Sequence, residues 1–75
     1  MGSVQLITDL CYYISNVTQE EFKKDMFPDC KDNYYVHKQC ELMRNDFDTF
    51  WLRLADIDRQ ALIKAVQNRY SHDSQ

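Results

Sequence analysis

The fold depends most on residues 33–55, which read NYYVHKQCELMRNDFDTFWLRLA. This stretch contains no glycine or proline, and its apolar side chains recur at alternating steps of four and three residues: Val36, Cys40, Met43, Phe47, Phe50 and Leu54. Such spacing is the a/d pattern of a helix that packs along one face, sustained over about three heptads. We therefore expect one long central helix over residues 33–55, with Asp32 as its N-cap.

Shorter helices are predicted before it. In residues 4–17 the side chains of Leu6, Ile7, Leu10, Ile14 and Val17 fall on one broad helical face, with Tyr13 at its edge. Thr18-Gln19-Glu20-Glu21 then has the capping-box pattern, in which the Thr18 hydroxyl and the Glu21 carboxylate each bond the other residue's backbone N–H. The helix it starts would turn Phe22, Met26 and Phe27 inward, and Pro28 would end it.

The last helix is predicted over residues 59–70, with Asp58 as its cap and an inner stripe of Leu62, Ile63, Val66 and Tyr70. Glycine occurs once, at Gly2, and no Asn-Gly or Asp-Gly pair is present to form tight hairpin turns. The fold class is therefore all-α. We expect a compact bundle of three to four helices, formed by a single domain over residues 3–70, and a frayed C-terminal tail over residues 71–75.

The composition excludes several classes of protein. Of the 75 residues, 44% are hydrophobic and 28% are charged, and the net charge is −3, a balance typical of a folded chain and not of a disordered one. No apolar run approaches the ~18–20 residues that span a bilayer, so no membrane segment is expected. The acidic charge argues against a nucleic-acid module, which typically carries a strong positive excess. Three cysteines, an odd number, favour a reducing intracellular setting, most simply the cytoplasm.

The predicted central helix is apolar on a second side as well, which is typical of a helix that is wrapped on both faces by shorter helices in a bundle or of one that is shared with a partner. Tyr and Trp are enriched where interfaces gain most of their binding energy. We accordingly predict a partner-binding surface made by Tyr34, Tyr35, Leu42 and Leu52 of this helix together with Tyr12. The predicted function is a small acidic protein–protein interaction module, adaptor-like or inhibitor-like, that docks on a larger protein or on a second copy of itself as a homodimer.

Two alternatives remain open. Cys30, His37 and Cys40 form C-x6-H-x2-C, to which Cys11 could add a fourth zinc ligand, although this is not a usual zinc-finger spacing and Cys40 lies on the apolar seam. In a second alternative the chain is a weak DNA-binding or regulatory domain. Its phosphate contacts would come from the last predicted helix, through Arg59, Lys64 and Arg69.

Neither a cofactor nor a metal belongs to the leading interpretation. An enzyme is not expected, nor a small-molecule substrate, because so short a chain rarely encloses a cleft of several hundred Å³. The carboxylates of Asp46-x-Asp48 and Asp56-x-Asp58 lack the glycine of a calcium loop, so we interpret them as helix caps and solvated surface.

Overall fold

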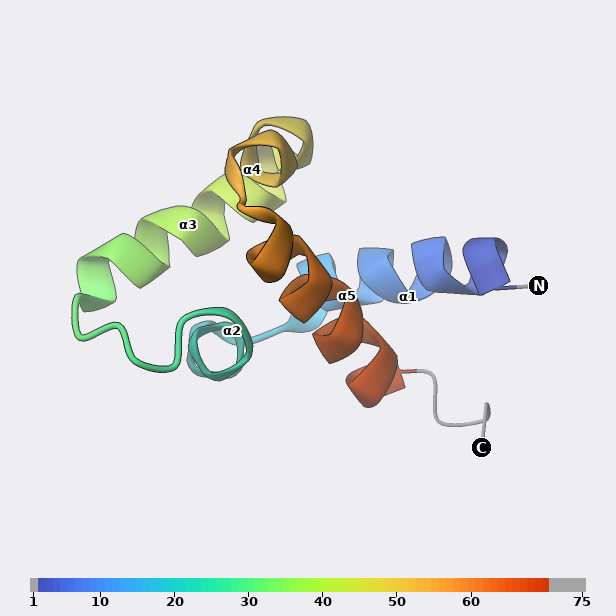
Figure 1. The fold of residues 1–75 in the computed structure, drawn as a ribbon, viewed down its shortest axis with the longest axis horizontal. Helices are drawn as coiled ribbons and strands as arrows, with labels where there is room; N and C mark the ends of the chain where they lie inside the picture. The colour runs from blue at the N-terminus through green and yellow to red at the C-terminus, as the bar shows by residue number, and fades with distance from the viewer. Residues whose placement is uncertain (1, 71–75) are drawn as a thin grey trace.

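The computed structural model describes residues 2–70, and every regular element in that range is an α-helix (Figure 1). The five helices are α1 (Gly2–Asn16), α2 (Gln19–Met26), α3 (Asn33–Asn45), α4 (Phe47–Arg53) and α5 (Asp56–Tyr70). The all-α prediction is confirmed. The expected frayed tail over residues 71–75 lies outside the described residues.

The expected long central helix is wrong, because the chain breaks at Asp46 between α3 and α4. Asp46 leaves the helical region, with φ −151° and ψ 75°, and its carboxylate accepts bonds from the Thr49 backbone N (3.3 Å) and hydroxyl (2.7 Å). An aspartate offers the backbone this local alternative to helix, which is why it favours caps over helix interiors. The fold is thus five helices, not three to four around one rod.

The apolar seam survives this break. Val36, Cys40 and Met43 from α3 are buried, as are Phe50 from α4 and Leu54 just after it. The backbone remains hydrogen-bonded through the junction, since the Asp46 N–H donates to the Leu42 carbonyl at 2.8 Å. The a/d spacing therefore predicted correctly that five of its six side chains are buried, even though two helices carry them, whereas Phe47 is half-buried and packs against the edge of the core.

The ends of the other helices were predicted unevenly. The capping box at Thr18 is confirmed, with both reciprocal bonds at 3.0 Å, and so is the Asp32 cap, whose carboxylate accepts from the N–H groups of Tyr34 and Tyr35. The last helix begins at Asp56 and not at Arg59. Asp58 therefore lies in its first turn, where its N–H donates to the Ala55 carbonyl at 2.9 Å.

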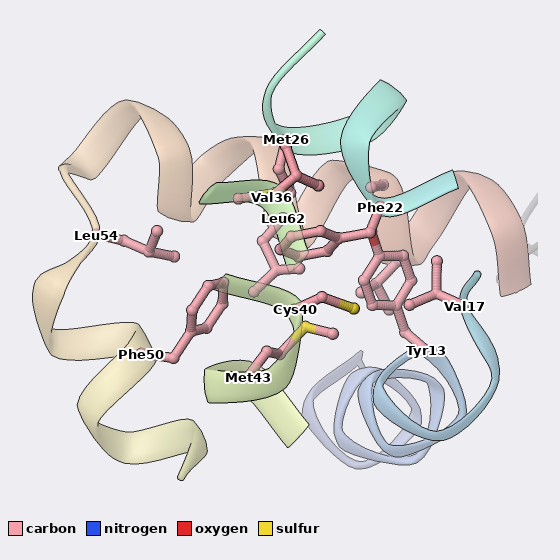
Figure 2. Packing of buried hydrophobic residues seen from close by; sticks show 12 residues of the cluster. Tyr13, Val17, Phe22, Met26, Val36, Cys40, Met43, Phe50, Leu54 and Leu62 are labelled. Carbon is pink, nitrogen blue, oxygen red and sulfur yellow. The ribbon is translucent and has the colours of Figure 1, made fainter. Parts of the chain in front are cut away.

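The core is one cluster to which all the helices contribute (Figure 2). Phe22 of α2 lies at its centre and is fully buried, with its ring 6.1 Å from that of Phe50 and 5.8 Å from that of Phe27. Leu62 of α5 and Tyr13 of α1 are also fully buried. Within this arrangement α1 packs on α5, while α2 packs on both α3 and α5.

Two arginines bind backbone carbonyls at the C-terminal ends of helices for which the sequence predicts no capping residue. The Arg44 guanidinium of α3 donates to the carbonyls of Ile14 (2.8 Å) and Val17, at the C-terminal end of α1. Arg59 of α5 donates to the carbonyls of Trp51 (2.9 Å) and Leu52 (3.3 Å), near the end of α4. A cation there satisfies open carbonyls and opposes the negative end of the helix dipole.

No helix among the described residues is long and apolar enough to cross a membrane.

Candidate interaction surface

An apolar groove of about 290 Å³ opens between α1, α4 and α5. We call it the apolar groove, and its lining consists of Leu6, Ile7 and Leu10 from α1, Phe47 and Trp51 from α4, and Leu62, Ile63 and Val66 from α5. Leu62 and Val66 are buried at its floor, whereas Ile7 is 62% exposed at its edge. Core side chains thus continue into a surface that other helices leave open.

The α4 wall of the apolar groove is held by aromatic packing and by Arg59. The rings of Phe47 and Trp51 stack at 5.9 Å, and Phe47 also lies 6.0 Å from Phe50 in the core. The Arg59 guanidinium lies 5.4 Å from the Trp51 ring centre, a cation–π arrangement, while donating to the carbonyls of α4. The wall is therefore set by three kinds of contact and does not depend on a bound ligand.

The lining offers almost no chemistry beyond apolar burial. Its side chains are aliphatic or aromatic, and the indole N–H of Trp51 is their one polar group. A nucleophile, a general base and an oxyanion donor are all missing from such a set. What the groove can do is remove apolar side chains of an occupant from water, which stabilises a complex by roughly 25 cal/mol per Å².

The outward face of α1 borders the apolar groove and is apolar too. Val4, Ile7, Cys11 and Ile14 follow one another at steps of three, four and three residues. We call these four residues the α1 seam. Val4 is 76% exposed, Cys11 is exposed, and Ile14 is half-buried. A neighbouring stripe of α1, which includes Tyr13, packs into the core, and Ile14 lies at the boundary and packs against the core as well.

The five residues predicted from sequence to bind a partner lie on three helices and do not line the apolar groove. Tyr34 and Leu52 are strongly exposed, at 69% and 73%, and Tyr35 is 45% exposed with its ring against Phe27. Leu42 is half-buried against the core. Tyr12 is exposed on α1 and stacks with Tyr70 at 6.2 Å. Their binding role remains a prediction.

Sequence reasoning missed the groove because its walls come from three segments of the chain. Two signals were nevertheless present. Trp51 lies at the edge of the a/d seam, so that it could reach beyond the face that α3 and α4 bury. The apolar residues of α1 also cover more of its circumference than one core-facing stripe needs.

The zinc alternative requires four side chains that the structure does not bring together. Within residues 2–70, no three His, Cys, Asp or Glu side chains are grouped so as to hold a metal ion. Cys40 is buried in the core, where desolvation raises the pKa of its thiol, while Cys11 is exposed on α1. His37 instead contacts Glu41 at 3.4 Å and Gln19 at 3.1 Å.

The DNA-binding alternative loses two of its three phosphate contacts to internal bonds. Arg59 is engaged at the end of α4, as described above. Arg69 donates from Nε and Nη2 to the two carboxylate oxygens of Asp25, at 2.8 and 3.1 Å, and lies 3.4 Å from Glu21. Of the three basic residues proposed for phosphate contact, Lys64 alone is exposed on α5.

The same carboxylate completes an internal polar cluster that joins α1, α2 and α5. The buried Tyr13 hydroxyl donates to Asp25 at 2.8 Å, beside Arg69. Burial and this hydrogen bond raise the pKa of Tyr13 well above its usual range, because both favour the neutral phenol. The hydrogen bond to Asp25 raises the pKa of Arg69 further. The cluster fastens the end of α5 to α2.

Comparison of the chain with protein-family models, with curated proteins and with solved structures finds no match. The site must therefore be interpreted from its own geometry.

Proposed function

We propose that this chain is a small acidic protein-interaction module whose apolar groove binds an uncharged, apolar helix face of a protein partner. The observation that carries the proposal is the lining of the groove, eight apolar side chains around about 290 Å³, at the junction of three helices. Grooves between helices commonly take an amphipathic helix, whose apolar side chains enter at steps of three and four residues.

The partner's chemistry follows from what surrounds the groove. Of the fifteen residues of α1, Asp9 alone is charged, and it is 3% exposed. An outward face without charge gives no electrostatic advantage to a strongly basic or acidic ligand. On its α1 side the groove therefore favours a partner helix whose contacting face is neutral.

Catalysis is not part of the proposal, because the groove holds no group that could act as nucleophile or base. An intracellular location also remains a prediction; the free state of Cys11, Cys30 and Cys40 in the structure is compatible with it. The exposed Tyr34, Tyr35 and Leu52 could extend the contact to a larger partner, but they lie on helices α3 and α4 and need a separate test.

The test compares two substitutions of the same kind at exposed isoleucines. Ile7 lines the apolar groove and is 62% exposed, whereas Ile57 of α5 is 76% exposed and outside the groove. Tagged wild-type, Ile7→Glu and Ile57→Glu proteins would be used as baits in extract from the host. Untagged copies of the chain would be present in the extract, so that a second copy can also be recovered. We expect a partner that wild type and Ile57→Glu recover and that Ile7→Glu loses at least tenfold.

Equal recovery of every protein by Ile7→Glu and wild type would contradict the proposal. Far-ultraviolet circular dichroism of both variants controls for folding, and both positions are exposed enough that glutamate should be tolerated. A recovered partner would then be purified and titrated into the chain. Trp51 is the one tryptophan of the chain and lies in the groove wall, so its emission should shift to shorter wavelength when the groove fills.

A further inference from the structure

We propose that the occupant of the apolar groove is helix α1 of a second copy of this chain, in a two-fold symmetric antiparallel dimer. The inference rests on the function proposed above and adds the identity of the partner.

The spacing of the α1 seam indicates that a helix packs on it. Steps of three, four and three residues form the a/d pattern by which one helix packs along another. The core uses a neighbouring stripe of α1 together with Ile14 at the end of the seam, whereas Val4, Ile7 and Cys11 remain exposed. Val4 and Ile7 are 76% and 62% exposed. The periodicity selects a helix as the occupant.

The spacing of the α1 seam is compatible with a two-fold symmetric dimer. In a two-fold dimer, when residue i of one copy meets residue j of the other, j also meets i. The α1 seam satisfies this rule in antiparallel register, since its steps read the same from either end. Val4 then faces Ile14 of the second copy, and Ile7 faces Cys11. Each pair occurs twice, so four small or medium apolar contacts line the axis.

The α1 seam is continuous with the apolar groove. Ile7 belongs to both, so a helix lying on the seam would border the groove that Phe47 and Trp51 also line. Figure 1 shows the N-terminal end of α1 extending beyond the other helices, where a second copy could approach it. The apolar surface offered is therefore wider than one helix edge.

The α1 seam carries no charged side chain. Two copies each carrying a net charge of −3 repel one another, and they can associate most easily through an uncharged face. Among the five helices, α1 has the fewest charged residues, and its single carboxylate is buried. An identical neutral helix satisfies this condition, whereas a basic partner would find no exposed acid on the α1 seam.

The available surface is sufficient for a weak interface. The chain exposes 5356 Å² in total, so the ~600 Å² per partner at the lower end of standard interfaces is roughly one ninth of it. We expect a reversible, concentration-dependent dimer and not an obligate one.

The experiment measures mass by light scattering from about 1 µM to about 1 mM, a range that covers weak association. Wild type should rise from the mass of one chain toward that of two. Ile7→Glu places a charge both in the α1 seam and at the edge of the apolar groove. Val4→Glu changes the seam alone, because Val4 does not line the groove. Both variants should stay monomeric at concentrations at least tenfold above the wild-type midpoint, while Ile57→Glu should match wild type.

Cross-linking tests the register. The proposed pairing places residue 7 opposite Cys11 of the second copy, so Ile7→Cys should form an intermolecular disulfide with it under mild oxidation. Ile57→Cys serves as the control and should form much less. Preferential dimerisation of wild type through Cys11 alone would indicate a parallel arrangement and would overturn the antiparallel register.

The outcomes separate this inference from the function on which it rests. A wild type that stays monomeric at about 1 mM overturns the second-copy inference; if extract capture then depends on Ile7, the proposed function survives. A dimer that Ile7→Glu retains overturns the inference, because the chains then meet through another surface. A dimer lost in Ile7→Glu but retained in Val4→Glu overturns α1 as the occupant while leaving the groove as the contact.

Discussion

The molecule has two apolar regions that differ in how they are covered. On one side the seam of α3 and α4 is enclosed by α2 and α5, so that Phe22, Val36 and Phe50 are fully buried. On the other side the groove between α1, α4 and α5 leaves Ile7 exposed over a buried floor. Both regions have helical spacing in the sequence. Periodicity thus identifies an apolar face, but the number of neighbouring helices determines whether it is covered.

The largest expected contrast lies between Phe22→Ala and Ile7→Ala. Truncation of a fully buried phenylalanine costs about 3–5 kcal/mol, because burial is lost and a cavity remains. The exposed Ile7 should cost less than about 0.5–1 kcal/mol in the monomer, since most of its side chain is already in water. Urea unfolding of dilute protein measures both. Equal losses would show that the groove is part of the core.

The next contrast concerns how α1 is attached to the closed side. Arg44→Met removes the guanidinium that binds the Ile14 and Val17 carbonyls and should lower the free energy of unfolding by about 1–2 kcal/mol. Arg53→Met, at an exposed arginine in the last turn of α4, should change it by less than about 0.5 kcal/mol. The same urea titration compares the two. If Arg44→Met and Arg53→Met change the free energy of unfolding equally, α1 is held by its apolar contacts alone.

A smaller effect is expected at the junction that divides the two regions. Asp46→Ala removes the cap of α4 and should destabilise the protein, because the Thr49 N–H loses its acceptor. The Thr49 bonds hold the pKa of Asp46 below its usual value of 3.8. This contribution is therefore present above pH 4 and is lost as the pH falls through the lower folded-state pKa. Thermal unfolding at pH 7 and pH 3 should show a smaller difference between variant and wild type at pH 3. An unchanged difference would contradict the assigned role.

The smallest effect concerns the polar cluster behind the closed region. Tyr13→Phe removes the hydroxyl bonded to Asp25 and should cost about 1 kcal/mol at neutral pH. Because the pKa of Tyr13 is raised in the folded state, its stabilising contribution is complete below pH 10 and declines as the pH rises further. The stability difference between wild type and Tyr13→Phe should therefore narrow between pH 9 and pH 11. A constant difference would mean that the pKa of Tyr13 is the same in the folded and unfolded states and would contradict its raised value.

Much of the closed region could be predicted from sequence. The spacing of Val36, Cys40 and Met43 identified their buried face, and the Thr18 capping box fixed the start of α2. The break at Asp46 was missed because an aspartate without neighbouring glycine or proline is also compatible with an exposed position in a continuous helix. The local signal was Thr49, three residues further on, whose N–H and hydroxyl Asp46 binds.

The open region could be predicted only in part. That Tyr34 and Leu52 would be exposed follows from their position opposite the seam, and the structure places both at the surface. The groove requires α1, α4 and α5 to meet, and that arrangement depends on tertiary contacts that single-helix periodicity does not encode. The two arginine caps were missed for the same reason, since Arg44 binds carbonyls some thirty residues earlier in the chain.

The most direct test of the account follows side-chain methyl signals by nuclear magnetic resonance as wild-type protein is diluted. If α1 of a second copy fills the apolar groove, the methyl groups of Ile7, Leu10 and Ile63 should shift with concentration, while those of the core residues Val17 and Val36 stay constant. The account is contradicted if the groove signals do not move up to about 1 mM, or if the moving signals belong instead to Leu52 on the outer face of α4.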